Sequence, residues 1–566
     1  MSSHGVTAAH NDVTDVPTDL TSPQAPPAGP ETPQWRRYGW PALIVLSVLI
    51  PFGVVANTAM HSITTFDGGL NFQVAYNMLH GVGYARDYGG VTYSPVEVET
   101  SGYFLVISAV GFKLLGITNL SLNLPNLLFM LVLLAGASYA LRRRPILRLL
   151  APFAIVLITP HVAEFGLDGF GEFVSAALTV WCFVLLTELI EGVSRPYLIS
   201  SLAFVVMGVG LTIKVVYIAT VPVAIGAFVL ALLLHPQLRR TRFVLTVLWT
   251  ALPIGLWEIY RISEVRSFHE FLAYWHAQLL GISDRAATNE AHVGILQKGA
   301  DHFHLLRGAT GLDAVPLLLI LVVPIVALAG ALVLARHNLR EWVGKGGHSL
   351  ALQLGVFAAL YEIWWMFLTP TAQAWLRRFL IGWIALVLLT LLLCGMLWDE
   401  VAPRVRAGSM RTRWLVAGPA VACVALLAVL TVPGEWSIAK YNAKSYKAPD
   451  SEQVAEKGAS AEAVRLAASG GKLCGSGWWA APVVSLTAKA PLCNLVTIPN
   501  ATACSPEWQK AFADGRVYLI WDRYASGIVS ATPPPTARFK FTRKVANPTT
   551  YASFWTADYI NPAMCK

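Results

Sequence analysis

Charged side chains are scarce in this chain of 566 residues, and their scarcity sets the class of protein. Asp, Glu, Lys and Arg make up 13% of the residues, against ~25% in an ordinary soluble domain. So few charges cannot cover the surface of a soluble protein of 61.4 kDa, which excludes a cytosolic enzyme, a disordered protein and a fibrous repeat protein. Hydrophobic residues reach 55%, and this composition indicates a polytopic α-helical membrane protein.

The sequence also lacks a large net charge, an internal repeat and a signal peptide. The net charge of +9 is modest for this length, so we expect the excess Arg and Lys to report membrane topology and not nucleic-acid binding. No repeat with a period of 20–50 residues is present, which argues against a solenoid or propeller. The first apolar run, at 39–60, starts too far into the chain for a signal peptide and lacks a cleavage pattern, so we expect a retained helix.

Cysteines are few, and their positions divide them into two groups. Three lie in apolar segments, where a thiol acts as a small hydrophobe: Cys182, Cys394 and Cys423. Four lie in the polar C-terminal tail: Cys474, Cys493, Cys504 and Cys565. These four predict two disulfides in an oxidising compartment, with three pairings open; the alternative is four free thiols.

Eleven apolar segments are long enough to be predicted as membrane spans. They are 39–60, 121–141, 146–163, 171–191, 197–213, 215–234, 242–260, 313–335, 349–368, 378–398 and 414–433. The apolar segment 102–117 reaches only ~24 Å as a helix, so we expect it to lie in the membrane interface.

The arginines give these spans an orientation. With eleven spans, the positively charged loops all fall on one side, which the positive-inside rule assigns to the cytoplasm. These positions are Arg36, Arg37, Arg142, Arg143, Arg144, Arg148, Arg195, Arg239, Arg240, Arg242, Arg336, Arg340, Lys345, Arg404, Arg406, Arg411 and Arg413. An odd number of spans places the C-terminus outside, in agreement with the cysteines. We predict a bacterial inner-membrane protein with a cytoplasmic N-terminus and a periplasmic C-terminal domain.

The chain therefore divides into three predicted parts. Residues 1–34, rich in Pro, Thr, Ser and Asp, are expected to be a disordered cytoplasmic tail. Residues 35–433 form the transmembrane module, with outer loops at 61–120 and 261–312. Residues 434–566 mix helical patterns (459–469, 505–513) with strand-like ones (494–498, 516–521), which predicts a small periplasmic α/β domain with disulfides.

Acidic residues gather in the predicted outer loops. Asp67 follows the first span, ahead of a short helix whose Leu70, Val74 and Met78 would face the membrane until Gly81 and Gly83 end it. The other outer acids are Glu97, Glu99, Asp168 and Glu172. The acids at 97 and 99 are candidates for binding an acceptor or a metal, and Glu172 lies within the predicted membrane boundary. The alternatives are helix capping by Asp67, a solvated pair at 97 and 99, and acids that stabilise a helix N-terminus.

Three cations break the positive-inside pattern. Lys214 lies between two spans on the predicted outer side, and Arg377 and Arg378 lie at the outer start of another. A cation at this depth can pair with a lipid phosphate. The alternative for each is a side chain that snorkels to the surface.

The first outer loop resembles a known superfamily. Asp67 after the first span, the helix that ends in residues 78–84, and residues 100–103 leading into 104–117 resemble the polyprenol-phosphate-dependent membrane glycosyltransferases called GT-C. Residues 171–172 and 211–214 are also similar to that superfamily. Protein O-mannosyltransferases and bacterial lipid A aminoarabinose transferases have the most similar pattern. The resemblance extends over about residues 39–240; beyond that it rests on helix number and polarity.

The resemblance implies both a fold and a reaction. GT-C enzymes pass a sugar from an undecaprenyl-type lipid phosphate to a hydroxyl of a lipid, glycan or protein, with inversion expected at the anomeric carbon. It implies that Asp67 is the catalytic base, that Lys214, Arg377 and Arg378 bind the donor phosphate, and that Asp168 and Glu172 orient the acceptor, the base or a metal. No cofactor is expected, and a divalent metal, which some relatives use, is not predicted.

Two departures from the pattern leave the acceptor open. Gly68 stands where many relatives have a second acid, and residues 99–102 replace a Lys-Pro-Pro motif found in enzymes that modify lipid A. The competing functions are a polytopic transporter or flippase, a polymerase or ligase of envelope glycans, and a non-catalytic assembly protein. A transporter is disfavoured because the charges cluster at one membrane face and not at the midplane.

Overall fold

The computed structural model describes most of the spans and parts of the tail. The described residues are 34–60, 64, 66–88, 91–93, 100–162, 167, 169–265, 267–273, 275–276, 294–368, 376–407, 434–440, 442–444, 451–475, 486, 492–494, 500–522, 538–546 and 552–559. The expected tail at 1–33, the predicted span at 414–433, and residues 97, 99 and 168 lie outside them.

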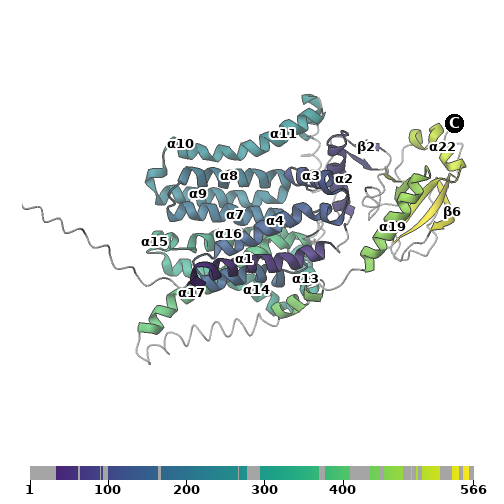
Figure 1. Cartoon of the computed structure of the whole chain (residues 1–566). Helices are drawn as coiled ribbons and strands as arrows, with labels where there is room; N and C mark the ends of the chain where they lie inside the picture. The colour runs from purple at the N-terminus through teal and green to yellow at the C-terminus, as the bar shows by residue number, and fades with distance from the viewer. Residues whose placement is uncertain are drawn as a thin grey trace, which may run out of the picture. The chain divides into compact units, whose positions relative to one another are not determined.

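Long apolar helices form most of the described chain (Figure 1). The α-helices are α1 (Gln34–Ala59), α4 (Asn119–Ala140), α5 (Pro145–Ile158), α7 (Glu172–Glu191), α8 (Pro196–Ile213), α9 (Thr220–Leu234), α10 (Thr241–Val244), α11 (Ala251–Val265), α14 (Ala314–Ala335), α16 (His348–Ile363) and α17 (Leu380–Ala407). Short helical segments connect or extend them: η1 (Val215–Ala219), η2 (Pro236–Leu238), η3 (Leu245–Thr250), α15 (Leu339–Gly344), η4 (Trp364–Leu368) and η5 (Leu376–Phe379). Helix α7 packs against α4, α8 and α9, which lie alongside it in Figure 1.

Nine helical stretches in the described part are long and apolar enough to cross a membrane, and each matches a predicted span. This confirms a multi-pass α-helical architecture. The span predicted over 146–163 differs, because α5 has 14 residues and ends at Ile158, before Pro160. A helix of that length covers about 21 Å, short of the hydrocarbon core. The short helix expected at 102–117 is confirmed as α3 (Tyr103–Leu115).

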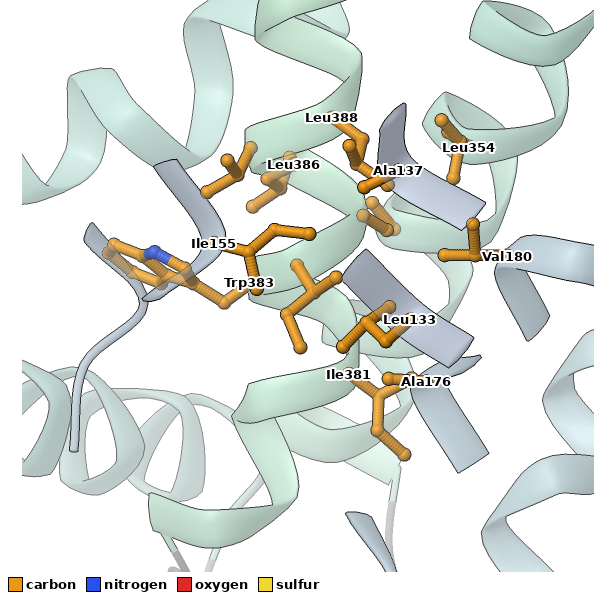
Figure 2. Close-up of a cluster of buried hydrophobic side chains, with 14 of the residues drawn as sticks. Leu133, Ala137, Ile155, Ala176, Val180, Leu354, Ile381, Trp383, Leu386 and Leu388 are labelled. Carbon is orange, nitrogen blue, oxygen red and sulfur yellow. The ribbon is translucent and has the colours of Figure 1, made fainter. Parts of the chain in front are cut away.

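The core between the helices consists of closely packed apolar side chains. Figure 2 shows part of it: Leu133 and Ala137 of α4, Ile155 of α5, Ala176 and Val180 of α7, Leu354 of α16, and Ile381, Trp383, Leu386 and Leu388 of α17. The indole nitrogen of Trp383 donates a hydrogen bond to the carbonyl oxygen of Ile158 over 2.9 Å. This bond satisfies a backbone group at the end of α5 and fixes α17 beside it.

The first outer loop begins with α2 (Phe66–Leu79), which ends before Gly81 and Gly83, both with positive φ, as predicted. The expected contact of its apolar face with the membrane is wrong. Leu70 and Val74 are 7% and 0% exposed, and Val74 belongs to a core shared with α3, α7 and α8. Polar Asn71, Gln73 and Asn77 are buried as well, so α2 lies inside the protein.

The C-terminal part contains a mixed seven-stranded sheet. Its strands are β1 (Arg86–Tyr88), β2 (Val91–Tyr93), β3 (Lys472–Gly475), β4 (Leu492–Asn494), β5 (Val517–Asp522), β6 (Phe539–Ala546) and β7 (Ala552–Tyr559), in the order β2-β1-β4-β3-β5-β7-β6. Helices α19 (Ser451–Ala468), α21 (Asn500–Ala503) and α22 (Pro506–Ala513) accompany it, and Cys474 and Cys504 are disulfide-bonded.

This sheet joins two distant parts of the chain. β1 and β2 come from the first outer loop, and β1 pairs in parallel with β4 through Tyr88 and Leu492. The tail sheet and the loop that carries Asp67 are therefore one hydrogen-bonded structure.

Candidate functional site

A buried ion pair marks one end of α7. Lys214 Nζ lies 2.6 Å from Glu172 Oε1, and both side chains are at most 1% exposed. Glu172 is the first residue of α7, after Gly171 with a left-handed backbone (φ 71°), and Lys214 ends α8. Two opposite charges at this separation neutralise each other where a single charge would be costly. Complete burial excludes the alternative in which Lys214 snorkels to the surface.

Phe170 connects this pair to the neighbouring elements. Its carbonyl oxygen accepts hydrogen bonds from Lys214 Nζ and from Thr100 Oγ1, the latter over 2.7 Å. Ser101, which follows Thr100, makes two hydrogen bonds to the end of α8. Its Oγ donates to the carbonyl oxygen of Thr212, and its backbone N–H donates to the carbonyl oxygen of Ile213. Residues 100 and 101 thus hold the first outer loop against the turn before α7 and the end of α8.

Two glycines place α2 directly against the turn before α7. A Cβ atom built on Gly169 would lie 2.6 Å from the Cα of Gly68, so the two backbones touch. Asn71 Nδ2 also donates to the carbonyl of Gly169 over 2.8 Å. Gly68 follows Asp67 in the chain, and Gly169 follows Asp168. The contact therefore brings together the backbone segments that carry the two predicted acids.

The predicted arginine pair lies in η5, where Arg377 is 6% exposed. The guanidinium carbon of Arg377 is 3.7 Å from the ring centroid of Phe170, so the cation stacks on the same residue that holds Lys214. The guanidinium of Arg378 lies 5.1 Å from the centroid of Trp365. Stacking uses the face of a guanidinium, while its N–H donors project in its plane toward any bound anion.

The second outer loop adds two residues that the sequence did not single out. Helix α13 (Ile295–Thr310) buries Lys298 and His302, which are one turn apart on one face. The His302 ring packs edge-on against Phe379 of η5, with centroids 5.8 Å apart. Desolvation lowers the pKa of His302; the charge of Lys298 lowers it further, whereas the backbone bond to Lys298 and the charge of Asp301 oppose the shift. Desolvation also lowers the pKa of Lys298.

A further buried cation, Arg261, lies near the end of α11. Arg261 is 5% exposed, and its guanidinium carbon lies 5.0 Å from the ring centroid of Trp275 and 5.4 Å from that of Tyr84. Its Nη1 lies 3.1 Å from Glu258 Oε1. Tyr84 belongs to the first outer loop, so this cation joins the two outer loops. The positive-inside rule does not single out Arg261, because a single arginine at the end of a span is common.

The opposite end of α7 carries the predicted cytoplasmic charges. Arg142 pairs with Glu188 and Glu191, and Arg143 pairs with Glu191. Glu172 and Glu191 are the first and last of the 20 residues of α7, which is about 30 Å long. Glu172 and Lys214 therefore lie at the end of α7 opposite the arginine cluster.

The structure describes some of the predicted site residues completely and others only in part or not at all. Glu172, Lys214, Arg377 and Arg378 are described in full; the first three converge around the turn at 169–171, whereas the guanidinium of Arg378 lies against Trp365. Asp67 is described as the second residue of α2 but not in its side chain, and Glu97, Glu99 and Asp168 lie outside the described residues. Among side chains that are described, no group of three His, Cys, Asp or Glu is placed to hold a metal.

Chemically, the arrangement combines a segment that carries an acid with stacked cations, of which Arg377 is buried. Such a site can take a proton from a hydroxyl on one side and stabilise a phosphate anion on the other.

Comparison with known proteins shows a shared fold. No protein-family model matches the sequence, and no curated protein matches it. Among solved structures, ArnT from Cupriavidus metallidurans bound to undecaprenyl phosphate matches with a TM-score of 0.55 and 15% identity, over 92% of this chain and 98% of that one. The apo form of ArnT matches with a TM-score of 0.56 and 14% identity, over 94% and 99%. The chain thus shares the fold of these ArnT structures, and together with its apolar helices and C-terminal sheet this confirms the fold class expected from the sequence.

Proposed function

We propose that this protein is an inverting membrane glycosyltransferase that moves a sugar from a polyprenyl-phosphate donor to a hydroxyl of a lipid, glycan or protein acceptor. The fold supports the proposal, because ArnT shares it along almost its whole length and was solved with undecaprenyl phosphate bound. The observation that carries it is the Gly68–Gly169 contact. Through it, the loop bearing Asp67 meets the turn whose Phe170 lies beneath Arg377.

The roles follow from the chemistry of the groups. The acceptor hydroxyl gives its proton to the Asp67 carboxylate as its oxygen attacks the anomeric carbon. The bond from that carbon to the phosphate oxygen breaks on the opposite face, so the configuration inverts and polyprenyl phosphate leaves. Arg377 and Arg378 stabilise the charge that develops on the phosphate.

The buried pair takes a supporting role in this proposal. Glu172 and Lys214 fix the carbonyl of Phe170, and with it the ring on which Arg377 stacks. Lys214 is then a positioning residue, and its contact with the donor phosphate stays a prediction. Asp168 remains assigned to the orientation of acceptor or base, and Glu97 and Glu99 to an acceptor or metal contact.

The proposed setting is the outer face of a bacterial inner membrane. The arginine cluster at the far end of α7 supports it, since such clusters mark the cytoplasmic side. The two disulfide-bonded cysteines of the tail support an oxidising compartment on the other side.

Native mass spectrometry of the protein purified in mild detergent tests the donor. We expect a bound polyprenyl phosphate, bare or carrying a sugar whose mass identifies it, and loss of that lipid in the Arg377→Gln/Arg378→Gln variant. Asp67→Asn should retain the lipid and abolish consumption of the sugar-bearing lipid in native membranes. If only bulk phospholipid is found in the presence of excess undecaprenyl phosphate, a transporter or assembly role is favoured instead.

A further inference from the structure

Two buried polar groups near η5 have no hydrogen-bond partner for atoms that need one. Glu362, on α16, is 9% exposed, and within the described chain neither carboxylate oxygen has a partner. His302, on α13, is 1% exposed, and its Nε2 likewise has none. Folded proteins pair nearly all buried polar groups, and a carboxyl group within a membrane span is particularly costly. Nε1 of Trp365 in η4 is a further unpartnered atom in this region, and a ligand whose hydroxyl groups both donate and accept would satisfy all three residues.

Both groups face the same short stretch of chain. The His302 ring packs on Phe379, and the Glu362 carboxyl lies at Gly382, where any Cβ atom would collide with it. Phe379 and Gly382 are three residues apart at the junction of η5 and α17, and this spacing places them on one face. Arg377 and Arg378 directly precede them. The unpaired groups therefore adjoin the cations assigned to the donor phosphate.

The two groups share one chemical character. His302 Nδ1 lies 2.8 Å from the carbonyl oxygen of Lys298, which can only accept, so Nδ1 carries the hydrogen. Because desolvation lowers the pKa of His302, the ring is neutral near pH 7 and its Nε2 is a hydrogen-bond acceptor. The carbonyl oxygen of the Glu362 carboxyl group also accepts, and in the protonated form that burial favours its O–H can donate to a hydroxyl oxygen as well. The complementary ligand is one that presents several hydroxyl donors within a small volume.

We propose that His302 and Glu362 form the subsite that binds hydroxyl groups of the donor sugar, beside the arginines that bind its phosphate. This inference rests on the proposed function and extends it to sugar recognition. Sugar hydroxyls supply the missing donors, and the absence of a side chain at Gly382 leaves space for the carboxyl that receives them. Among the residues that the structure describes, no third His, Cys, Asp or Glu joins the two to complete a metal site.

The test compares lipids that differ only in the sugar. The probes are undecaprenyl phosphate alone and undecaprenyl phosphate bearing D-glucose, D-mannose, D-galactose or D-arabinose, titrated against the full-length protein by native mass spectrometry. We expect the wild type to bind at least one sugar-bearing lipid about tenfold more tightly than the bare lipid. Glu362→Gln and His302→Asn should each remove most of that preference and leave the affinity for bare lipid within about twofold. Asn retains a donor near the position of Nδ1 and lacks Nε2, whereas His302→Gln extends to Nε2 and should restore part of the preference.

Two further variants separate sugar binding from structural damage. Arg378→Gln should weaken binding of bare and sugar-bearing lipids alike. Glu362→Met removes an unpaired buried acid, so it should raise the melting temperature of the lipid-free protein while it abolishes the sugar preference.

Each contrary outcome has a distinct meaning. Parallel loss of bare and sugar-bearing lipid in Glu362→Gln would make the residue structural and overturn the inference. An unchanged preference in both Glu362→Gln and His302→Asn, or a wild type that prefers no sugar-bearing lipid, would overturn it too. A wild type that fails to bind even bare undecaprenyl phosphate would instead overturn the proposed function.

Discussion

The Gly68–Gly169 contact yields the sharpest prediction, because one methyl group disrupts it. In Gly169→Ala the new Cβ would lie 2.6 Å from the Cα of Gly68, whereas carbon atoms pack at ~3.5–4.0 Å. The two segments must therefore separate by about 1 Å. Gly169 does not have a positive φ, so alanine fits its backbone and only the contact changes.

A displacement of this size has a kinetic consequence in the proposed mechanism. Moving a reacting group by ~1 Å can reduce a rate by about 10²-fold, which corresponds to ~2.7 kcal/mol in the activation barrier. We expect Gly169→Ala to lower the rate at which sugar-bearing undecaprenyl phosphate is consumed by about that factor, with the lipid still bound. The control is Gly53→Ala on α1, because a Cβ at Gly53 meets nothing within 4 Å. A folded Gly169→Ala protein with the wild-type rate would refute the role of this contact.

Three other outcomes are expected. Lys214→Met alone should lower the free energy of unfolding by about 3–5 kcal/mol, because it leaves the buried Glu172 carboxylate unpaired. Adding Glu172→Gln should recover much of that loss in a thermal melt. Losses that simply add would contradict a coupled pair. Folding lowers the pKa of His302, so as the pH falls below ~6.5 this histidine is protonated in the unfolded chain before it is protonated in the folded one. The free energy of unfolding should therefore decline from pH 7 to 5 more steeply in the wild type than in His302→Asn. Equal slopes in the two proteins would refute this. Reduction with dithiothreitol should lower the melting temperature of the tail, which contains the disulfide-bonded Cys474 and Cys504, and an unchanged melt would show that these bonds contribute no stability.

The apolar spans were the most predictable part of the fold. Hydrophobic length determines whether a helix can cross a bilayer, so nine of the predicted spans recur within the described chain. The exception at 146–163 shows the limit of this criterion, because hydropathy continued past a Thr-Pro step at which α5 ends. The place of β1 and β2 in the sheet could not be predicted for a different reason: β4, with which β1 pairs, lies about 400 residues away in the chain.

The site was predictable in location and less so in its contacts. Charges that violate the positive-inside rule located Lys214, Arg377 and Arg378 at one membrane face. Their environments depend on tertiary packing, so the pairing of Lys214 with Glu172 and the stacking of Arg377 on Phe170 had no sequence signal. Glu362 did have a signal in the sequence, because an acid within an apolar span is a functional candidate by default.

The placement of Phe170 offers a reason for a buried ion pair beside the loop that carries the proposed base. An apolar pair of similar volume would pack at least as stably as Lys214 and Glu172. It would not donate to the carbonyl of Phe170, and that carbonyl also accepts from Thr100 of the first outer loop. Losing the lysine leaves a buried backbone acceptor short of one donor and loosens the residue on which Arg377 stacks. The ion pair therefore contributes position more than stability, holding the acid-bearing loop and the phosphate-binding cation against a single residue.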